Sequence, residues 1–408
     1  MNAPDHEKFL ALAKASRRDH LRHMGAAVAG IGVSAATVSS AGAWPGGKPP
    51  VSSEATPTPG GPAGGAEGGM PPFSFRLEAS EPQVVAAGLN RFATLAEMPV
   101  LQDIAFVRET INPGAAREIH WHMTQNELTT VLSGTGRVYL LNTAGEYTEF
   151  DAAEGDIIFV PNGAAHSFAN TGDTALELLL AFSDTNAASI DLSISLPLFP
   201  QQIITQPVGV PMDALPTLPI QGDGFTVPVP EWTGETKPST LPAADPARYF
   251  TTAAAIPEKQ FPGGKAWALS RDQIPTLDTL TVYRLLMDAN SLREPHWHPG
   301  INELNYCLSG RSQFGLISPD GQVQTFVVEP GDVAFMPANW LHYIMPLDGE
   351  PSELLVHFTD IVGTHLELSE IYDAFPPQLL SASFGLDPAP FAALPHKGDV
   401  FLAGPVEE

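Results

Sequence analysis

The chain has 408 residues, of which 43% are hydrophobic and 16% are charged, a composition typical of a globular protein with room for two domains. Its 46 acidic residues outnumber the 20 basic ones, and the net charge of −26 repels phosphate backbones and anionic lipid. We therefore expect no nucleic-acid partner and, for the mature protein, no membrane partner. The single cysteine, Cys307, excludes a disulfide within the chain and a metal site made of cysteines.

Residues 1–43 contain the parts of an export signal. The stretch SRRDHLR at 16–22 precedes a short apolar run of small residues, which is followed by AGA at 41–43. Paired arginines, a short apolar region and an A-x-A site are typical of the twin-arginine route, so we expect a periplasmic or extracellular protein. A basic tail without a targeting role is the alternative. The apolar run is too short and too rich in glycine and serine for a membrane-spanning helix.

Two segments rich in proline divide the rest of the chain. The first, 44–72, is also rich in glycine, cannot bury enough apolar surface to offset its chain entropy and is predicted to be a flexible linker. The second, 208–246, separates two more regular regions. The expected organisation is therefore a first domain at 73–207, a second domain at 247–400 and a short C-terminal tail at 401–408.

The two regular regions have the pattern of β-structure. Short runs rich in β-branched residues, such as GDIIFVP at 155–161, alternate with breaks made of Gly, Pro, Asn and Asp. TAGE at 143–146 and PDGQ at 319–322 are predicted hairpin turns. A helical pattern is scarce, and its best candidate is LELSEIYDAF at 366–375. The chain is therefore predicted to be all-β with a few short helices.

The strongest organisational signal is an internal repeat. REIHWHMTQNE at 117–127 returns as REPHWHPGINE at 293–303, which is an offset of 176 residues. Nine chemically distinctive positions share this offset, so the chain contains two copies of one β-rich domain. These positions are Arg117, His120, His122, Glu127, Gly134, Gly155, Asp156, Pro161 and His166, and their counterparts are Arg293, His296, His298, Glu303, Gly310, Gly331, Asp332, Pro337 and His342.

Each copy carries two histidines at positions i and i+2. On a strand such residues point to the same face, so the pair presents two imidazoles side by side. A glutamate follows after a tight turn, and a third histidine lies on a later strand that could return over the pair. Three neutral imidazoles and one carboxylate can bind a divalent metal and leave positions open for a substrate. The predicted ligands are His120, His122, Glu127 and His166 in the first copy, and His296, His298, Glu303 and His342 in the second.

These residues resemble the two motifs of the cupin superfamily, whose members fold as jelly-roll β-barrels. The first motif, G-x5-H-x-H-x3–4-E-x6-G, is matched from His120 to Gly134, and the second, G-x5-P-x-G-x2-H-x3-N, is matched at 155–170. In the second copy, Asn339 replaces the third-position glycine and Pro346 replaces the final asparagine. These changes are expected to affect the shape of the turn and not metal binding. The resemblance implies two tandem cupin domains.

The pattern R-E-x-H-W-H in both copies resembles the bicupin oxalate decarboxylases, and the likeness covers roughly residues 72–385. The resemblance implies a manganese ion in each domain, dioxygen as co-reactant and oxalate as the substrate that coordinates the metal. Arg117 and Arg293 match the arginine that holds oxalate in this family. A guanidinium near the metal can clamp a small dicarboxylate by charge-assisted hydrogen bonds. The resemblance further implies a homo-oligomer, either a trimer or a hexamer of stacked trimers.

The chain departs from this family at the residue that donates a proton. In the family, a glutamate on a mobile lid after the last strand of the first domain supplies the proton that yields formate. The corresponding stretch, FSDTNAASIDLSI at 182–194, contains no glutamate, and Asn186 or a neighbour stands at the lid position. Asp184 and Asp191 are the nearest carboxylates and are the candidate proton donors. In the second copy, Val356 stands where the family has a glutamate.

Three functions stay open on these residues. Oxalate decarboxylation is the leading one, and oxalate oxidation to carbon dioxide and hydrogen peroxide is the alternative because the lid glutamate is missing. A metal-binding cupin that holds another small carboxylate without oxalate turnover is the third. The first copy follows the second motif more closely and carries the lid-like stretch, which favours it as the catalytic copy. His357, His365 and His396 lie outside the motifs and are expected to be structural or exposed.

Overall fold

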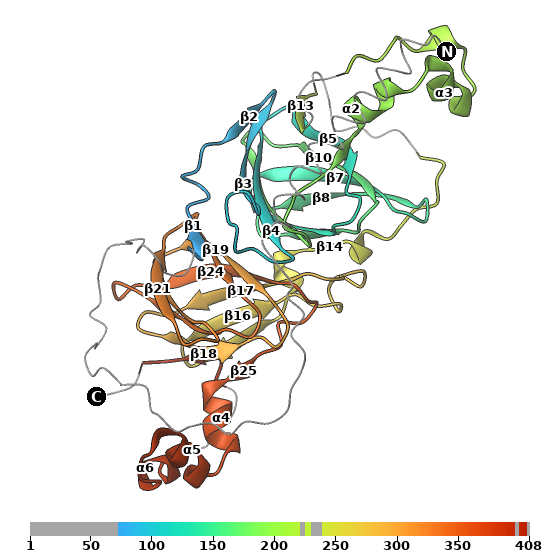
Figure 1. Ribbon diagram of the computed structural model, residues 1–408. Helices are drawn as coiled ribbons and strands as arrows, with labels where there is room; N and C mark the ends of the chain where they lie inside the picture. The colour runs from blue at the N-terminus through green and yellow to red at the C-terminus, as the bar shows by residue number, and fades with distance from the viewer. Residues whose placement is uncertain (1–71, 221–224, 230–238, 396–399, 406–408) are drawn as a thin grey trace, which may run out of the picture. The chain divides into compact units, whose positions relative to one another are not determined.

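The described part of the chain is mostly β-structure with a few short helices, and its strands form four antiparallel sheets (Figure 1). This confirms the predicted all-β class with two tandem domains. The predicted export signal and nearly all of the first linker lie outside the described residues. The computed structural model describes residues 72–220, 225–229, 239–395 and 400–405.

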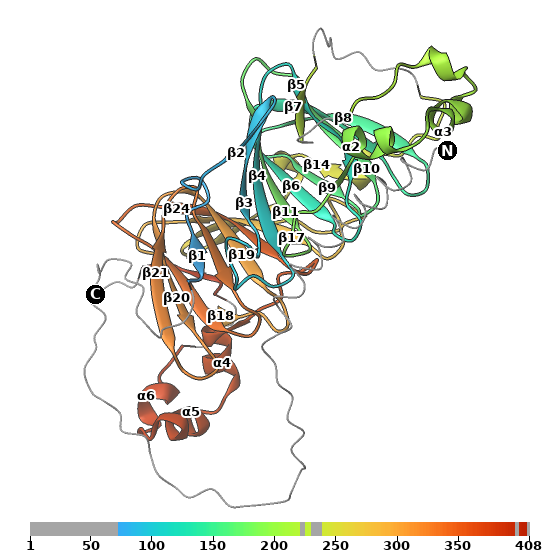
Figure 2. The same cartoon turned by 45° about the horizontal axis from the view of Figure 1, so that its top comes forward.

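The first copy builds a barrel from two sheets (Figures 1 and 2). One sheet contains, in spatial order, β14 (Phe250–Thr251), β9 (Ile157–Val160), β6 (Glu127–Ser133), β11 (Leu176–Phe182), β4 (Ala105–Ile111), β3 (Gly88–Ala93) and β2 (Gln83–Val85). The other contains β12 (Ile190–Asp191), β5 (Ala115–Trp121), β10 (Ala165–Asn170), β7 (Thr135–Leu141) and β8 (Tyr147–Ala153), and β13 (Thr226–Pro228) also pairs with β5.

The second copy repeats this arrangement strand for strand. One sheet contains β1 (Ser74–Phe75), β22 (Val333–Met336), β19 (Glu303–Ser309), β24 (Ser352–Phe358), β17 (Thr281–Met287), β16 (Gly264–Ala268) and β15 (Glu258–Phe261). The other contains β21 (Val323–Val328), β20 (Ser312–Ile317), β23 (Leu341–Pro346), β18 (Leu292–Trp297) and β25 (Leu366–Glu367), and β26 (Leu402–Ala403) also pairs with β18.

Two short strands are exchanged between the copies. β1 precedes the first barrel in the chain but pairs with β22 of the second, and Ser74 lies opposite Ala334. β14 follows the first barrel and pairs with β9, with Phe250 opposite Ile158. One sheet of each copy therefore gains an edge strand from outside its own copy, which covers backbone groups that an open edge would leave unpaired.

The continuous apolar runs in the sequence belong to strands that are buried on both faces. In β11, Leu178 and Leu180 pack into the core of the first barrel, whereas Leu179 and Ala181 pack into the larger core that includes the second barrel. Successive side chains of a strand point to opposite faces, so a strand between two cores needs apolar residues at every position. By contrast, β7 alternates between buried and exposed residues because only one of its faces is covered.

Two segments outside the predicted domains complete the barrels. Residues 226–228, within the predicted inter-domain linker, form β13 and pair with β5. Residues 402–403, within the predicted C-terminal tail, form β26 and pair with β18, and Leu402 is fully buried. The linker and tail boundaries differ from the prediction here because these short apolar segments add a strand to an open sheet edge.

Short helices follow each barrel. They are α2 (Leu192–Ser195) and α3 (Gln201–Thr205) after the first barrel, and α4 (Leu368–Ala374), α5 (Pro377–Phe384) and α6 (Ala389–Ala392) after the second. α4 lies within the predicted helix at 366–375. Within the described residues, no helix has the length and apolar character needed to cross a membrane.

The glutamate of the repeated R-E-x-H-W-H pattern ties the first helix to its barrel. Glu118 accepts hydrogen bonds from the backbone N–H and the hydroxyl of Ser193 at 2.9 and 2.8 Å. Glu294 makes the same pair of contacts with Ser369 at 2.8 Å each. A carboxylate that accepts two hydrogen bonds at a helix start satisfies donors that have no partner inside the helix.

The turn before the third histidine keeps its shape in both copies. Gly163 has φ +76°, and Asn339, its counterpart, has φ +66°. The backbone N–H groups of Gly163 and Asn339 donate to the carbonyls of His122 and His298 at 2.7 and 3.0 Å. At Asn339 the expected change of turn shape is therefore wrong, because asparagine tolerates the left-handed conformation better than most residues do.

Candidate metal centres

Each barrel brings four of the sequence-predicted ligands together in its interior. The ligand atoms of each group lie within 4.8 Å of one another, and all eight residues are buried. The groups are His120, His122, Glu127 and His166 in the first barrel, and His296, His298, Glu303 and His342 in the second.

Strand pairing explains why the ligands meet. His120 lies on β5 and is paired directly with His166 on β10. Glu127 is the first residue of β6, in the facing sheet, and it reaches the same point from the other side of the barrel. The second barrel repeats the pairing, with His296 opposite His342.

The histidines are held as neutral rings with one nitrogen turned to the centre. In the first barrel, the Nδ1 atoms of His120, His122 and His166 lie 2.8 to 3.0 Å from backbone carbonyl oxygens. A carbonyl can only accept, so each Nδ1 carries the proton and each Nε2 presents a lone pair. Burial lowers the pKa of His120 and His166, which keeps these rings uncharged.

Glu127 supplies the negative charge of the first centre. Its Oε2 lies 2.9 Å from Nε2 of His122 and 3.4 Å from Nε2 of His166, while its Oε1 accepts a hydrogen bond from the Thr129 hydroxyl at 2.6 Å. A carboxylate oxygen that faces imidazole lone pairs requires a cation between them, and the donor set fits a divalent metal.

The second centre has the same geometry. Oε2 of Glu303 lies 2.9 Å from Nε2 of His298 and 3.4 Å from Nε2 of His342, and Asn305 donates to Oε1 at 2.7 Å. The Nδ1 atoms of its three histidines lie 2.7 to 2.8 Å from backbone carbonyls. Burial lowers the pKa of His296 and His298. Nε2 of His342 and of His166 has no hydrogen-bond partner among the described residues, as expected of atoms reserved for a metal.

A buried arginine stands beside each centre and is already engaged. Arg117 donates to Oδ1 of Asp191 at 2.7 Å and to the Ser189 hydroxyl at 3.1 Å, and its guanidinium lies over the Phe225 ring at 4.8 Å. These contacts leave further N–H groups of the guanidinium for a ligand. In the second barrel, Arg293 makes the corresponding contacts with Glu367 and Phe401.

The two candidate proton donors, Asp184 and Asp191, have different surroundings. Asp191 is on β12, pairs with β5 and has its carboxylate committed to Arg117, so the geometry favours positioning of the arginine over proton transfer. Asp184 is half-buried and accepts a hydrogen bond from the backbone N–H of Asn186 at 3.1 Å. Neither aspartate belongs to the four-residue ligand group of the first centre.

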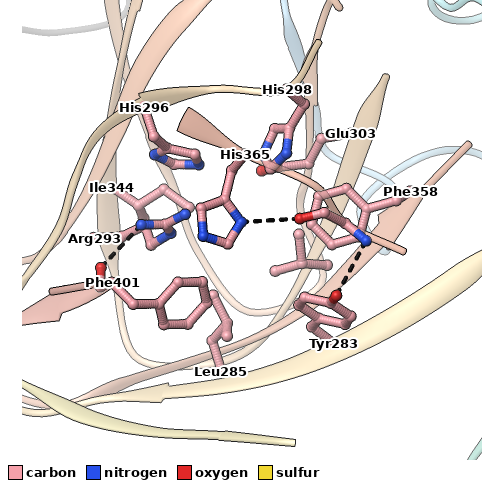
Figure 3. A pocket seen from close by; sticks show the side chains of 12 residues that line it. Tyr283, Leu285, Arg293, His296, His298, Glu303, Ile344, Phe358, His365 and Phe401 are labelled. Atoms are coloured by element: carbon pink, nitrogen blue, oxygen red, sulfur yellow. Dashed lines mark hydrogen bonds and ion pairs between the residues drawn. The ribbon is translucent and has the colours of Figure 1, made fainter. Parts of the chain in front are cut away.

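The second centre opens into a small cavity that His365 lines. The cavity has a volume of about 10 Å³, which is room for about one water molecule. Figure 3 shows His365 pointing into this space beside Arg293, and its ring lies 6.1 Å from the ring of His298. The structure therefore places His365 beside the second centre, although it lies outside the sequence motifs. His357, by contrast, is fully buried with its ring against that of Phe106, and His396 lies outside the described residues.

The repeat offers the signal that would have found His365. An offset of 176 residues leads from His365 to Ser189, the residue that Arg117 contacts, so both positions belong to segments that cross their barrels near the metal. The preceding residues, Ala188 and Thr364, supply the carbonyls for His122 and His298. One copy therefore has a hydroxyl at this place and the other has an imidazole.

Comparison with known proteins identifies the fold family. The model of the cupin family matches residues 81–210 and 253–390, which cover both barrels. The chain belongs to the cupin family. Its two cupin domains place it with the bicupin oxalate decarboxylases, as the sequence motifs predicted.

The relatives of this bicupin are similar to it over most of their length. Oxalate decarboxylase OxdC of Bacillus subtilis is 26% identical over 320 residues, which cover 77% of this chain and 82% of OxdC. The crystal structure of a Lactobacillus farciminis oxalate decarboxylase in complex with formate has a TM-score of 0.74 at 26% identity and covers 81% of this chain and 98% of its own. A structure of the B. subtilis enzyme, described by its Mn(II) centres, has a TM-score of 0.74 at 23% identity and covers 83% and 90%.

Proposed function

We propose that this bicupin is a manganese-dependent oxalate decarboxylase, which converts oxalate to formate and carbon dioxide with dioxygen as co-reactant. The observation that carries the proposal is the pairing, in both barrels, of a buried three-histidine, one-glutamate centre with a buried arginine. The similarity to oxalate decarboxylases extends over both barrels and supports the same substrate.

The donor set supports manganese as the metal. Imidazole nitrogens and a carboxylate oxygen suit Mn²⁺, and no sulfur ligand is present in either four-residue group to select a softer ion. When bound, manganese would supply open coordination positions for oxalate and, with dioxygen as the oxidant, would allow an electron to be drawn from it. His120, His122, Glu127 and His166 would hold the ion in the first barrel, and His296, His298, Glu303 and His342 in the second.

The remaining residues of the first centre would orient the substrate. The free N–H groups of Arg117 can bind a carboxylate of oxalate, and Asp191 holds the guanidinium in place for this contact. Arg117 is only 3% exposed, so such a contact is made away from water, where a charge-assisted hydrogen bond is strongest.

Oxalate oxidase activity is the second candidate. In the first barrel, the segment after β11 carries no glutamate that could donate a proton, which favours the oxidase. In the second barrel, Val356 lines the cavity and has no acidic group, which favours the oxidase as well. Without a proton donor, oxalate and dioxygen with two protons give two carbon dioxide molecules and hydrogen peroxide. A cupin that binds another small carboxylate without turnover is the third candidate, and the same assay separates all three.

The product formed from oxalate decides between these functions. We expect manganese-loaded protein in air, at mildly acidic pH, to release one formate for each oxalate consumed, measured by chromatography alongside a peroxide assay. Hydrogen peroxide without formate would establish the oxidase instead. Unchanged oxalate would contradict both and leave a metal-binding cupin with a different ligand.

We further propose that the protein is a homo-oligomer, a trimer or a hexamer. The helices after each barrel expose large apolar side chains, including Ile203 at 54% and Phe384 at 63% exposure. Exposed apolar clusters of this kind are typical of surfaces that are covered in an assembly. Light scattering on the full-length protein should give three or six times the mass of one chain, and Phe384→Glu should lower it.

We also propose export by the twin-arginine route, supported by the pattern in residues 16–43. This route carries folded proteins, so manganese can be bound before the protein meets metals that bind nitrogen and oxygen ligands more tightly. Replacement of Arg17 and Arg18 by lysine should keep the protein in the cytoplasm on cell fractionation. Unchanged export of this variant would contradict the proposal.

A further inference from the structure

The inner wall of the first barrel carries a buried polar trio that the second barrel lacks. Asn90, Glu109 and Thr226 are 0%, 2% and 0% exposed. Asn90 lies opposite Glu109 in the pairing of β3 with β4, and the Thr226 hydroxyl donates to Oε1 of Glu109 at 3.2 Å. At the 176-residue offset, the second barrel has three apolar residues instead, namely Ala266, Leu285 and Leu402.

Strand alternation places Glu109 on the face of β4 that points into the barrel. Val107 and Ile111, two residues to either side, belong to the core of the first barrel, so Glu109 shares their face. Its counterpart, Leu285, lines the cavity of the second centre together with the ligand His296 (Figure 3). Glu109 therefore faces the first metal centre from the barrel wall.

The surroundings of Glu109 keep its carboxyl protonated at mildly acidic pH. Burial raises the pKa of Glu109 to about 7, the positive charge of Arg117 opposes this, and the negative charges of Glu127 and Asp191 add to it. A divalent cation in the centre would lower this pKa, and a bound oxalate dianion would raise it, so the two act in opposite directions.

The side chain of Asn90 gives an independent indication that something binds at this wall. Its amide nitrogen and oxygen are both buried, and neither has a hydrogen-bond partner among the described residues. Burying an amide is unfavourable unless a ligand or an ordered water completes its hydrogen bonds. The second barrel has Ala266 here, so this requirement is specific to the first barrel.

We infer that Glu109 is the catalytic acid of the first centre, which gives a proton to the reacting carbon of oxalate; this inference rests on the proposed function. In this step the C–C bond of the oxalate dianion breaks, carbon dioxide leaves, and the net bonding electron pair stays on the remaining carbon. That carbon takes the proton of the Glu109 carboxyl to become formate, and Glu109 is left as a carboxylate. Solvent then returns one proton for each turnover.

This assignment accounts for two features of the chain. The segment after β11 needs no glutamate, because the acid comes from β4 in the barrel wall. Proton transfer also belongs to the first barrel, because Leu285 at the corresponding place in the second barrel has no proton to give. The polar trio thus gives the first centre a proton donor that the second centre, with the same metal ligands, does not have.

The test compares Glu109→Gln with the wild type as full-length, manganese-loaded protein given oxalate and air. Glutamine keeps the size of the side chain but has no acidic proton, so we expect the formate yield per oxalate consumed to fall at least about 100-fold. Dioxygen would then oxidise oxalate to carbon dioxide, with hydrogen peroxide as the reduced product. Glu177→Gln is the matched control, because Glu177 on the neighbouring β11 pairs with Arg108 instead of facing the barrel core, and it should keep the wild-type yield.

A second measurement is independent of turnover. A buried protonated carboxyl has a distinct infrared C=O stretching band, which should be present at acidic pH in the wild type and fade as the pH rises and Glu109 loses its proton. The band should be missing from Glu109→Gln and present in Glu177→Gln.

The possible failures are distinguishable. A normal formate yield from Glu109→Gln, or an infrared band that survives this substitution, would overturn the assignment of Glu109 while the wild type still makes formate. A wild-type protein that consumes no oxalate would overturn the proposed function and, with it, the proton transfer to oxalate.

Discussion

Replacement of Glu127 by glutamine is expected to remove the metal from the first centre and to lower formate production by more than about 100-fold. Glu127 is the only anionic ligand of this centre, and an amide offers no charge to offset that of a divalent cation. Loss of supporting contacts around a metal costs about 10- to 100-fold in affinity or activity, and loss of the charged ligand itself should cost more. Mass spectrometry should find one manganese ion for each chain instead of two.

The matched variant Glu303→Gln makes the same change in the second centre. It should also lower the metal content to one ion, but with a smaller loss of formate than Glu127→Gln, because the first barrel holds the polar trio (Asn90, Glu109, Thr226). If both variants keep one metal ion but Glu303→Gln loses more formate production than Glu127→Gln, turnover would be assigned to the second centre instead. Two ions retained in Glu127→Gln would contradict the ligand assignment.

Replacement of Glu367 by glutamine is expected to destabilise the second barrel by about 3–5 kcal/mol. Its Oε1 accepts a hydrogen bond from Arg293, and its Oε2 accepts one from the backbone N–H of Phe401 at 3.1 Å. Arg293 and Glu367 are 2% and 0% exposed, so the variant leaves a guanidinium buried without its countercharge, which costs far more than the loss of an exposed pair.

Denaturant unfolding of the full-length protein measures this effect as a shift of the midpoint for the second barrel. Asp151→Asn is the control, because Asp151 forms a surface pair with Arg137 and its side chain is 67% exposed, so its loss should cost no more than about 1 kcal/mol. The double variant Arg293→Met, Glu367→Gln should recover part of the stability, since it removes the isolated charge. Equal effects of the single variant and the surface control would contradict the account.

The sequence by itself determined the duplication, the β-class and the eight candidate ligands. His120 on β5 and His122 just after that strand are two residues apart, and this spacing is a local property that a single copy displays. The repeat then showed that this arrangement is not a chance one, because Glu127 and Glu303 are separated by the same offset as the histidines.

Only the tertiary structure decided what surrounds these ligands. Asp191 and His365 reach their centres on segments that cross the barrels. The side-chain partners of Arg117 include Asp191 of β12 and Phe225, the residue before β13, both far from it in the chain. No local pattern reports such contacts, because they form when the sheet edges close.

Glu109 is the clearest example of a residue whose environment is set only when the barrel closes. In the stretch AFVRETI it is one of several polar residues with no motif around it, and an exposed strand position would explain it equally well. Its burial follows from the packing of β3 and β13 beside β4 and β5, which places Asn90 and Thr226 around its carboxyl. Removal from water, which no sequence period encodes, is the physical cause that turns an ordinary glutamate into a candidate acid.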